Sequence, residues 1–371
     1  MAPTTDPDRP RSRQRVAIGC VVLTALATLV TLVVVVPNRS SPTAPPTTSA
    51  APTTALPPST APATTAEPVP HPPYPVGILT VTVTEPATGG APARTFPTDV
   101  RFPARAGAGA TGAPPDTPLR APGRFPLVVF SGGFAVSPEE YSVLLDRWAA
   151  AGFVVADPVY PFTSPSPTLA LDEGDIVHHP GDLSAVITTL LDADAGTTTG
   201  PGAALAGTID PDRIAAIGHS DGGDVTLAAV ADSCCHDPRI GAAVILSGAE
   251  STAFGGTYFA TTPAVPLLVV QGTADDINPP GCSVQLYDQA VAPKYYLSLD
   301  DQSHQGPYLE AGPARDTVQQ VVVDFLLGTV ERSGPALAAM HRDGDVPGSS
   351  SLTLSAPTGL AAGSCPGAPA G

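Results

Sequence analysis

The chain is 371 residues long, which is enough for one large domain or two ordinary ones, and its 46 prolines and 36 glycines indicate that part of it is not compact. Its formal net charge of -17 argues against a nucleic-acid partner, because binding to a phosphate backbone needs clustered Lys and Arg side chains. Nucleic acids and other polyanions are therefore not expected ligands.

Residues 1–36 have the pattern of a membrane anchor. A basic tail, residues 1–15, precedes an uncharged apolar run at residues 16–36. At about 1.5 Å per residue, this run is long enough to cross the ~30 Å hydrocarbon core of a bilayer. Because basic residues precede the run, the N-terminus is predicted to be cytoplasmic. We expect a single-pass signal anchor in the cell membrane with the rest of the chain extracytoplasmic. The alternative is a cleaved signal peptide and a secreted protein.

Residues 37–75 consist mainly of Pro, Thr, Ser and Ala. This segment has too few large apolar residues to bury a core, so it is predicted to be an extended, semi-rigid linker. In a polyproline-like conformation it could reach on the order of 100 Å. Such a linker would hold the following domain clear of a membrane.

From residue 76 onward, short apolar runs alternate with amphipathic ones. The expected helices cover residues 137–152 and 181–194, and a further helix begins near Asp221. The expected strands cover residues 79–85, 95–102, 126–133, 153–160, 213–218, 242–248, 266–272 and 294–300. Unbroken apolar strands separated by helices indicate a doubly wound, mostly parallel sheet with helices on both faces. The fold class is therefore α/β, with the main domain at residues 76–330 and a C-terminal extension at residues 331–371.

Residues 218–222, Gly-His-Ser-Asp-Gly, lie between an expected strand and an expected helix. Strand, G-x-S-x-G and helix are the context of a nucleophile elbow, in which a serine occupies a sharp, strained turn. Its neighbours two before and two after must lack Cβ atoms to avoid collision, and the following helix N-terminus favours developing negative charge. Ser220 is therefore predicted to be a nucleophile, the alternative being a residue of an ordinary turn.

A serine nucleophile needs a base and an orienting carboxylate. His304 is the predicted base, the alternative being a histidine of a surface loop. It follows the last expected strand on a loop, and such loops converge on one edge of a doubly wound sheet. His219 is bonded directly to Ser220, so its side chain should point away from the serine oxygen. The carboxylate should follow the strand at residues 266–272, where Asp275 and Asp276 are both candidates.

Backbone N–H groups are the expected donors of an oxyanion hole. One belongs to Asp221, just after the nucleophile, and one to Phe134, after two glycines at the end of an earlier strand. Four aromatic side chains are candidates for lining an apolar acyl pocket, the alternative being simple packing: Phe134, Tyr160, Phe162 and Tyr308. No metal or organic cofactor is implied, because no cluster of ligating side chains has metal-ligand spacing and no phosphate-binding loop is present.

These residues carry a family resemblance. The chain resembles the α/β-hydrolase superfamily, and within it the secreted, dienelactone-hydrolase-like esterases related to platelet-activating-factor acetylhydrolases and bacterial cutinases. The matching blocks are residues 123–134, 149–163, 178–191, 214–223 and 271–280. Relatives often have His-Gly where this chain has Gly132 and Gly133. In those families the triad acid commonly lies four residues before a proline that begins a helix, which favours Asp275, four before Pro279, over Asp276.

The sequence thus predicts a membrane-tethered, extracytoplasmic serine esterase. Its triad would be Ser220, Asp275 and His304, and its substrate a small-molecule, lipid or polyester ester. We expect a monomer. The first alternative is a peptidase or amidase with the same triad, and the second is a non-catalytic cell-envelope binding protein that kept the fold.

Four cysteines lie beyond the apolar run: Cys234, Cys235, Cys282 and Cys365. An extracytoplasmic location favours disulfides, and four cysteines allow three connectivities. A Cys282–Cys365 pair is favoured, because it would pin the Pro- and Gly-rich C-terminal tail to the domain.

Overall fold

The computed structural model describes residues 72–87, 92–105, 120–166, 168–260, 264–358 and residue 365. All of these residues belong to one unit, Thr65–Gly371. The predicted basic tail, the predicted membrane anchor and nearly all of the predicted linker lie outside the described residues. Among the described residues, no helix combines the length and the apolarity needed to cross a membrane.

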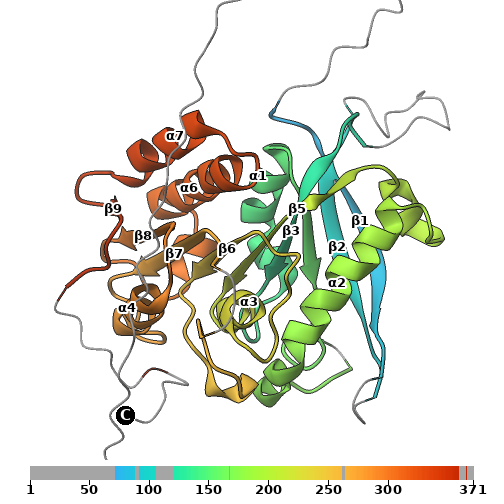
Figure 1. The fold of residues 1–371 in the computed structure, drawn as a ribbon, viewed down its shortest axis with the longest axis horizontal. Helices are drawn as coiled ribbons and strands as arrows, with labels where there is room; N and C mark the ends of the chain where they lie inside the picture. The colour runs from blue at the N-terminus through green and yellow to red at the C-terminus, as the bar shows by residue number, and fades with distance from the viewer. Residues whose placement is uncertain are drawn as a thin grey trace, which may run out of the picture. The chain divides into compact units, whose positions relative to one another are not determined.

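A nine-stranded sheet forms the centre of the described part (Figure 1). Its strands lie in the order β1-β2-β4-β3-β5-β6-β7-β8-β9. Its strands are β1 Val76–Glu85, β2 Arg94–Pro103, β3 Phe125–Ser131, β4 Val154–Pro158, β5 Ile209–His219, β6 Ala242–Leu246, β7 Leu267–Gly272, β8 Lys294–Leu299 and β9 Ser350–Thr353. The six strands from β4 to β8 pair in parallel, whereas β1, β2 and β9 are antiparallel to their neighbours. The predicted α/β class with a mostly parallel sheet is confirmed.

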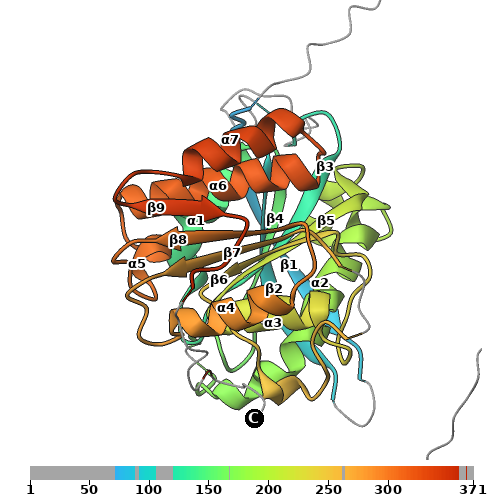
Figure 2. The same cartoon turned by 60° about the vertical axis from the view of Figure 1, so that its left-hand side comes forward.

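Helices pack against both sides of the sheet (Figure 2), with α1, α6 and α7 on one side and α2, α3 and α4 on the other. The helices are α1 Ser142–Ala150, α2 His179–Asp194, α3 Asp221–Ala231, α4 Pro280–Gln289, α5 Gly306–Leu309, α6 Pro313–Thr329 and α7 Gly334–Gly344. Short 3-10 turns lie at η1 Pro138–Tyr141, η2 Glu173–His178, η3 Gly200–Leu205 and η4 Thr252–Phe254.

Strand β3 shows why the central strands read as unbroken apolar runs. Its side chains alternate between two cores, since Leu127 and Val129 pack with residues of α2 and α3, whereas Val128 and Phe130 pack with residues of α1 and α6. All four side chains are fully buried. A strand that is covered on both faces therefore needs apolar residues at every position.

The sheet and its core continue beyond residue 330, into the predicted C-terminal extension. Helix α7 packs against α6, and β9 pairs antiparallel with β8 as the last strand of the sheet. Met340 of α7 and Leu352 of β9 are buried in the same core as α6. The sequence hid this because β9 is only four residues long and contains a single large apolar residue.

The parallel arrangement brings several loops to one edge of the sheet. Strands β3, β5, β7 and β8 all run in the same direction, so the segments that follow them start at the same edge. Gly133, Ser220, Asp275 and His304 lie in these four segments. The predicted site residues therefore converge because of the sheet topology.

Candidate active site

Ser220 occupies a strained turn between β5 and α3. Its φ of +56° and ψ of -126° lie outside the regions that L-residues normally adopt. A Cβ atom on Gly218 would overlap the carbonyl group of Gly222, and one on Gly222 would overlap the carbonyl oxygen of Ser131. The two glycines of the motif are therefore required by close backbone approaches on either side of the serine.

Three side chains are hydrogen-bonded in series at this turn. The Oγ of Ser220 lies 2.8 Å from Nε2 of His304. The other ring nitrogen of His304, Nδ1, lies 2.9 Å from Oδ2 and 3.1 Å from Oδ1 of Asp275. The imidazole of His304 thus bridges a hydroxyl and a carboxylate. This geometry allows a proton to pass from the serine to Nε2 while the carboxylate stabilises the resulting imidazolium.

The two candidate acids, Asp275 and Asp276, differ in burial. The side chain of Asp275 is completely buried and points to His304, whereas Asp276 is exposed. Burial raises the pKa of the Asp275 carboxyl, but the hydrogen bond and charge of His304 outweigh this effect and leave the pKa below its ordinary value. Asp275 is therefore the residue placed to orient the histidine.

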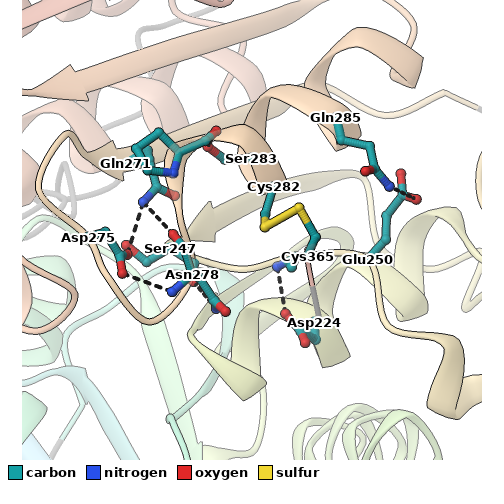
Figure 3. The surroundings of a disulfide bond; sticks show 12 residues. Asp224, Ser247, Glu250, Gln271, Asp275, Asn278, Cys282, Ser283, Gln285 and Cys365 are labelled. Carbon is teal, nitrogen blue, oxygen red and sulfur yellow. Dashed lines mark hydrogen bonds between the residues drawn. A yellow bond between two sulfur atoms is a disulfide. The ribbon is translucent and has the colours of Figure 1, made fainter. Parts of the chain in front are cut away.

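The Asp275 carboxylate is held by hydrogen bonds from the acid loop, residues 273–279, and from Gln271 of β7. Its Oδ1 accepts hydrogen bonds from the backbone N–H groups of Ile277 and Asn278, at 3.0 and 2.9 Å. Its Oδ2 accepts a hydrogen bond of 2.9 Å from Nε2 of Gln271, which also donates to the Asn278 carbonyl (Figure 3). The Asn278 amide in turn donates to the carbonyl oxygen of Ser247. Because both carboxylate oxygens accept hydrogen bonds, the buried side chain of Asp275 is held in one orientation.

The sequence pattern did not predict a role for Gln271 or Asn278. Each lies within four residues of Asp275, and each helps to fix its carboxylate. Amide side chains next to a predicted triad acid are the only signal that could have identified them. That signal is weak, because Asn and Gln are common in loops.

Two backbone N–H groups near Ser220 have no hydrogen-bond partner among the described residues. The N–H of Gly133 donates to Tyr141 and that of Ala135 to the Thr163 carbonyl, but the N–H of Phe134 between them has no partner among the described residues. At the start of α3, the N–H groups of Gly223 and Asp224 bond to the Ser220 carbonyl, whereas the N–H of Asp221 has no partner in the described part of the chain. The two predicted oxyanion donors are therefore unpaired groups in the part of the chain that the structure describes.

Asp221, which directly follows Ser220, is largely buried. One of its carboxylate oxygens is buried and has no hydrogen-bond partner among the described residues. Burial and, to a smaller extent, the charge of Glu173 raise the pKa of Asp221, the charge of His304 opposes them, and the result is a pKa of about 6. A carboxyl group with a raised pKa thus directly follows Ser220 in the chain.

Two of the four candidates for lining an apolar acyl pocket, Tyr160 and Tyr308, are buried in the interior. They are 3% and 1% exposed, and their hydroxyl groups bond to Ser131 and Ser247 in the interior. Each ring can be buried because its hydroxyl group has a hydrogen-bond partner in the interior. Phe162 remains 37% exposed, and Phe134 is partly exposed.

The four described cysteines form two pairs. Cys282, in the first turn of α4, is joined to Cys365 across a Cα–Cα distance of 5.3 Å (Figure 3), which confirms the predicted pairing. Cys234 is joined to its neighbour Cys235 beyond the end of α3. The first disulfide ties the C-terminal tail to the helix that follows the acid loop.

Two comparisons with known proteins bear on this site. The chain matches no model of a protein family, and a comparison with curated proteins finds no match either. What the site does must therefore be inferred from its residues and their geometry.

Proposed function

We propose that this protein is a serine hydrolase that cleaves carboxylic esters through an acyl-enzyme intermediate. The observation that carries the proposal is the series of hydrogen bonds from Ser220 through His304 to Asp275. The proposal is further supported by the N–H groups of Phe134 and Asp221, which have no partner among the described residues. A nucleophile, a base, an orienting acid and two oxyanion donors are the parts that acyl transfer needs.

In this proposal Ser220 attacks the acyl carbon while Nε2 of His304 takes the hydroxyl proton. Asp275 keeps the other ring proton on Nδ1 and stabilises the imidazolium. The N–H groups of Phe134 and Asp221 donate to the oxygen that becomes negatively charged. His304 then returns its proton to the leaving alcohol, and later activates a water molecule that releases the acid.

The choice of esters depends on the family resemblance. We propose that the described domain has the α/β-hydrolase fold and is related to the dienelactone-hydrolase-like secreted esterases. Support comes from five sequence blocks in the expected order and from a sheet in which Ser220, Asp275 and His304 follow parallel strands in that chain order. The substrate would be a small-molecule, lipid or polyester ester, bound by a monomer.

We also propose that the enzyme is tethered to the outer side of a cell membrane. This proposal rests on the basic tail and the apolar run at residues 16–36. Extraction of cell membranes with detergent, compared with a salt wash, would test it. Recovery of the full-length chain from the culture medium would contradict the anchor.

The activity is tested with a panel of p-nitrophenyl esters of rising acyl-chain length, run beside peptide anilides. We expect ester hydrolysis that is lost in Ser220→Ala. Hydrolysis of the anilides in place of the esters would make the protein a peptidase or amidase. Absence of both activities, together with absence of labelling by a fluorophosphonate, would refute the proposed enzyme.

A further inference from the structure

Two buried side chains beside the site are not used by the proposed triad. His219 ends β5 and is fully buried, and Tyr141 ends η1 and is 1% exposed. The hydroxyl group of Tyr141 lies 2.7 Å from Nδ1 of His219, and Nε2 of His219 lies 2.9 Å from the backbone carbonyl oxygen of His304. The pair therefore connects the segment after β3 with the loop that carries the proposed base.

The hydrogen-bond partners determine where the protons lie. A carbonyl oxygen can only accept, so Nε2 of His219 carries a proton and donates it to His304. Nδ1 is then unprotonated and accepts the hydroxyl proton of Tyr141. Burial and the charge of His304 together lower the pKa of His219 to about 3. His219 thus stays neutral and keeps one tautomer while His304 changes its protonation state.

The other end of this chain of hydrogen bonds holds the oxyanion loop, residues 132–136. The N–H of Gly133 donates a hydrogen bond of 3.0 Å to the Tyr141 oxygen. The backbone at Gly133 is so close to the nucleophile that a Cβ atom there would lie 3.1 Å from Cβ of Ser220. Since Gly133 is held in this way, the peptide that follows it is also held, and that peptide carries the unpaired N–H of Phe134.

We propose that Tyr141 and His219 are positioning residues that keep the oxyanion loop in register with the nucleophile and the base. The path runs from the Gly133 N–H through Tyr141 and His219 to the His304 carbonyl, so it joins the proposed oxyanion donor to the proposed base. The proposal rests on the proposed function, since it concerns the stabilisation of a developing oxyanion. Loss of the Tyr141 hydroxyl leaves two buried groups unpaired and frees the loop to shift.

The test compares Tyr141→Phe with Tyr296→Phe. Tyr296 is equally buried, and its hydroxyl group also has a buried partner, Ser283, but it does not contact the oxyanion loop. In Tyr141→Phe we expect kcat for a p-nitrophenyl ester to fall about 10- to 100-fold with KM within about twofold, because displacement of a catalytic group by about 1 Å costs on the order of 10²-fold. The affinity for a trifluoromethyl ketone, which forms a tetrahedral oxyanion on Ser220, should fall by the same factor. Tyr296→Phe should lower only the melting temperature.

A parent enzyme without esterase activity would refute the proposed function and leave no reaction for these residues to assist. With an active parent, an unchanged kcat and ketone affinity in Tyr141→Phe would overturn the positioning role, even if the melting temperature falls as in Tyr296→Phe. A rise in KM with kcat unchanged would overturn it as well. If Tyr141→Phe does not fold, His219→Leu gives the same readouts, and His219→Gln, which retains a donor and an acceptor, should recover part of the loss.

Discussion

Replacement of Asp275 by Asn is expected to disable the enzyme without unfolding it. The two side chains have nearly the same shape, but the amide can accept hydrogen bonds through only one of its two terminal atoms. At Oδ1 the carboxylate accepts from two backbone N–H groups, and at Oδ2 it accepts from Gln271. The NH₂ group of the introduced asparagine should therefore take the Oδ2 position, because fewer hydrogen-bond donors point at it there than at the Oδ1 position.

That position lies 2.9 Å from Nδ1 of His304. If the ring proton of His304 stays on Nδ1, an amide NH₂ group at this position faces another hydrogen-bond donor. The ring proton should therefore move to Nε2. Nε2 then cannot accept the proton of Ser220, which lies 2.8 Å away. In a serine triad this change of tautomer lowers turnover by about 10⁴-fold.

The assay is the initial rate of p-nitrophenyl ester hydrolysis by purified Asp275→Asn, with Asp276→Asn as the matched control. Asp276 is the exposed neighbour, so its replacement should leave turnover within about twofold. Circular dichroism should show both variants folded. If Asp276→Asn is the inactive variant, or if Asp275→Asn retains most of its turnover, the assignment of the acid is wrong.

Three further outcomes are expected. Ser220→Ala should abolish ester hydrolysis and fluorophosphonate labelling with an unchanged circular dichroism spectrum, and retained activity would rule out this nucleophile. The folded protein binds the Asp221 proton more tightly than the unfolded chain does, since the pKa is about 6 when folded, so the parent loses stability as pH rises from about 4 to about 6. The variant Asp221→Asn has no such carboxyl, so its free energy of unfolding should rise relative to that of the parent between these pH values, by at most about 3 kcal/mol. Urea titrations at several pH values measure this difference, and a difference independent of pH would contradict the prediction. Cys365→Ser should lower the free energy of unfolding by about 2–5 kcal/mol, because the disulfide to Cys282 closes a long loop; equal urea midpoints for parent and variant would show that the tail contributes nothing.

The sequence by itself determined the features that depend on neighbours along the chain. Apolar runs such as that of β3 predicted the parallel sheet, because a strand buried on both faces has no polar side to display. Gly218 predicted the sharp turn from a local cause, because a Cβ atom there would overlap the carbonyl group of Gly222, four residues further along the chain. These properties need no knowledge of distant contacts.

Only the tertiary structure decided which side chains meet. Spacing from β7 could not separate Asp275 from Asp276, since the choice depends on which carboxylate faces His304, a residue of another loop. Tyr308 is a plausible pocket residue in the sequence and is buried in the structure, because its hydroxyl group finds Ser247 in the interior. Tyr141 is 78 residues from the histidine that it contacts. Such pairs are formed by the packing of separate elements, and no local pattern of residue types records them.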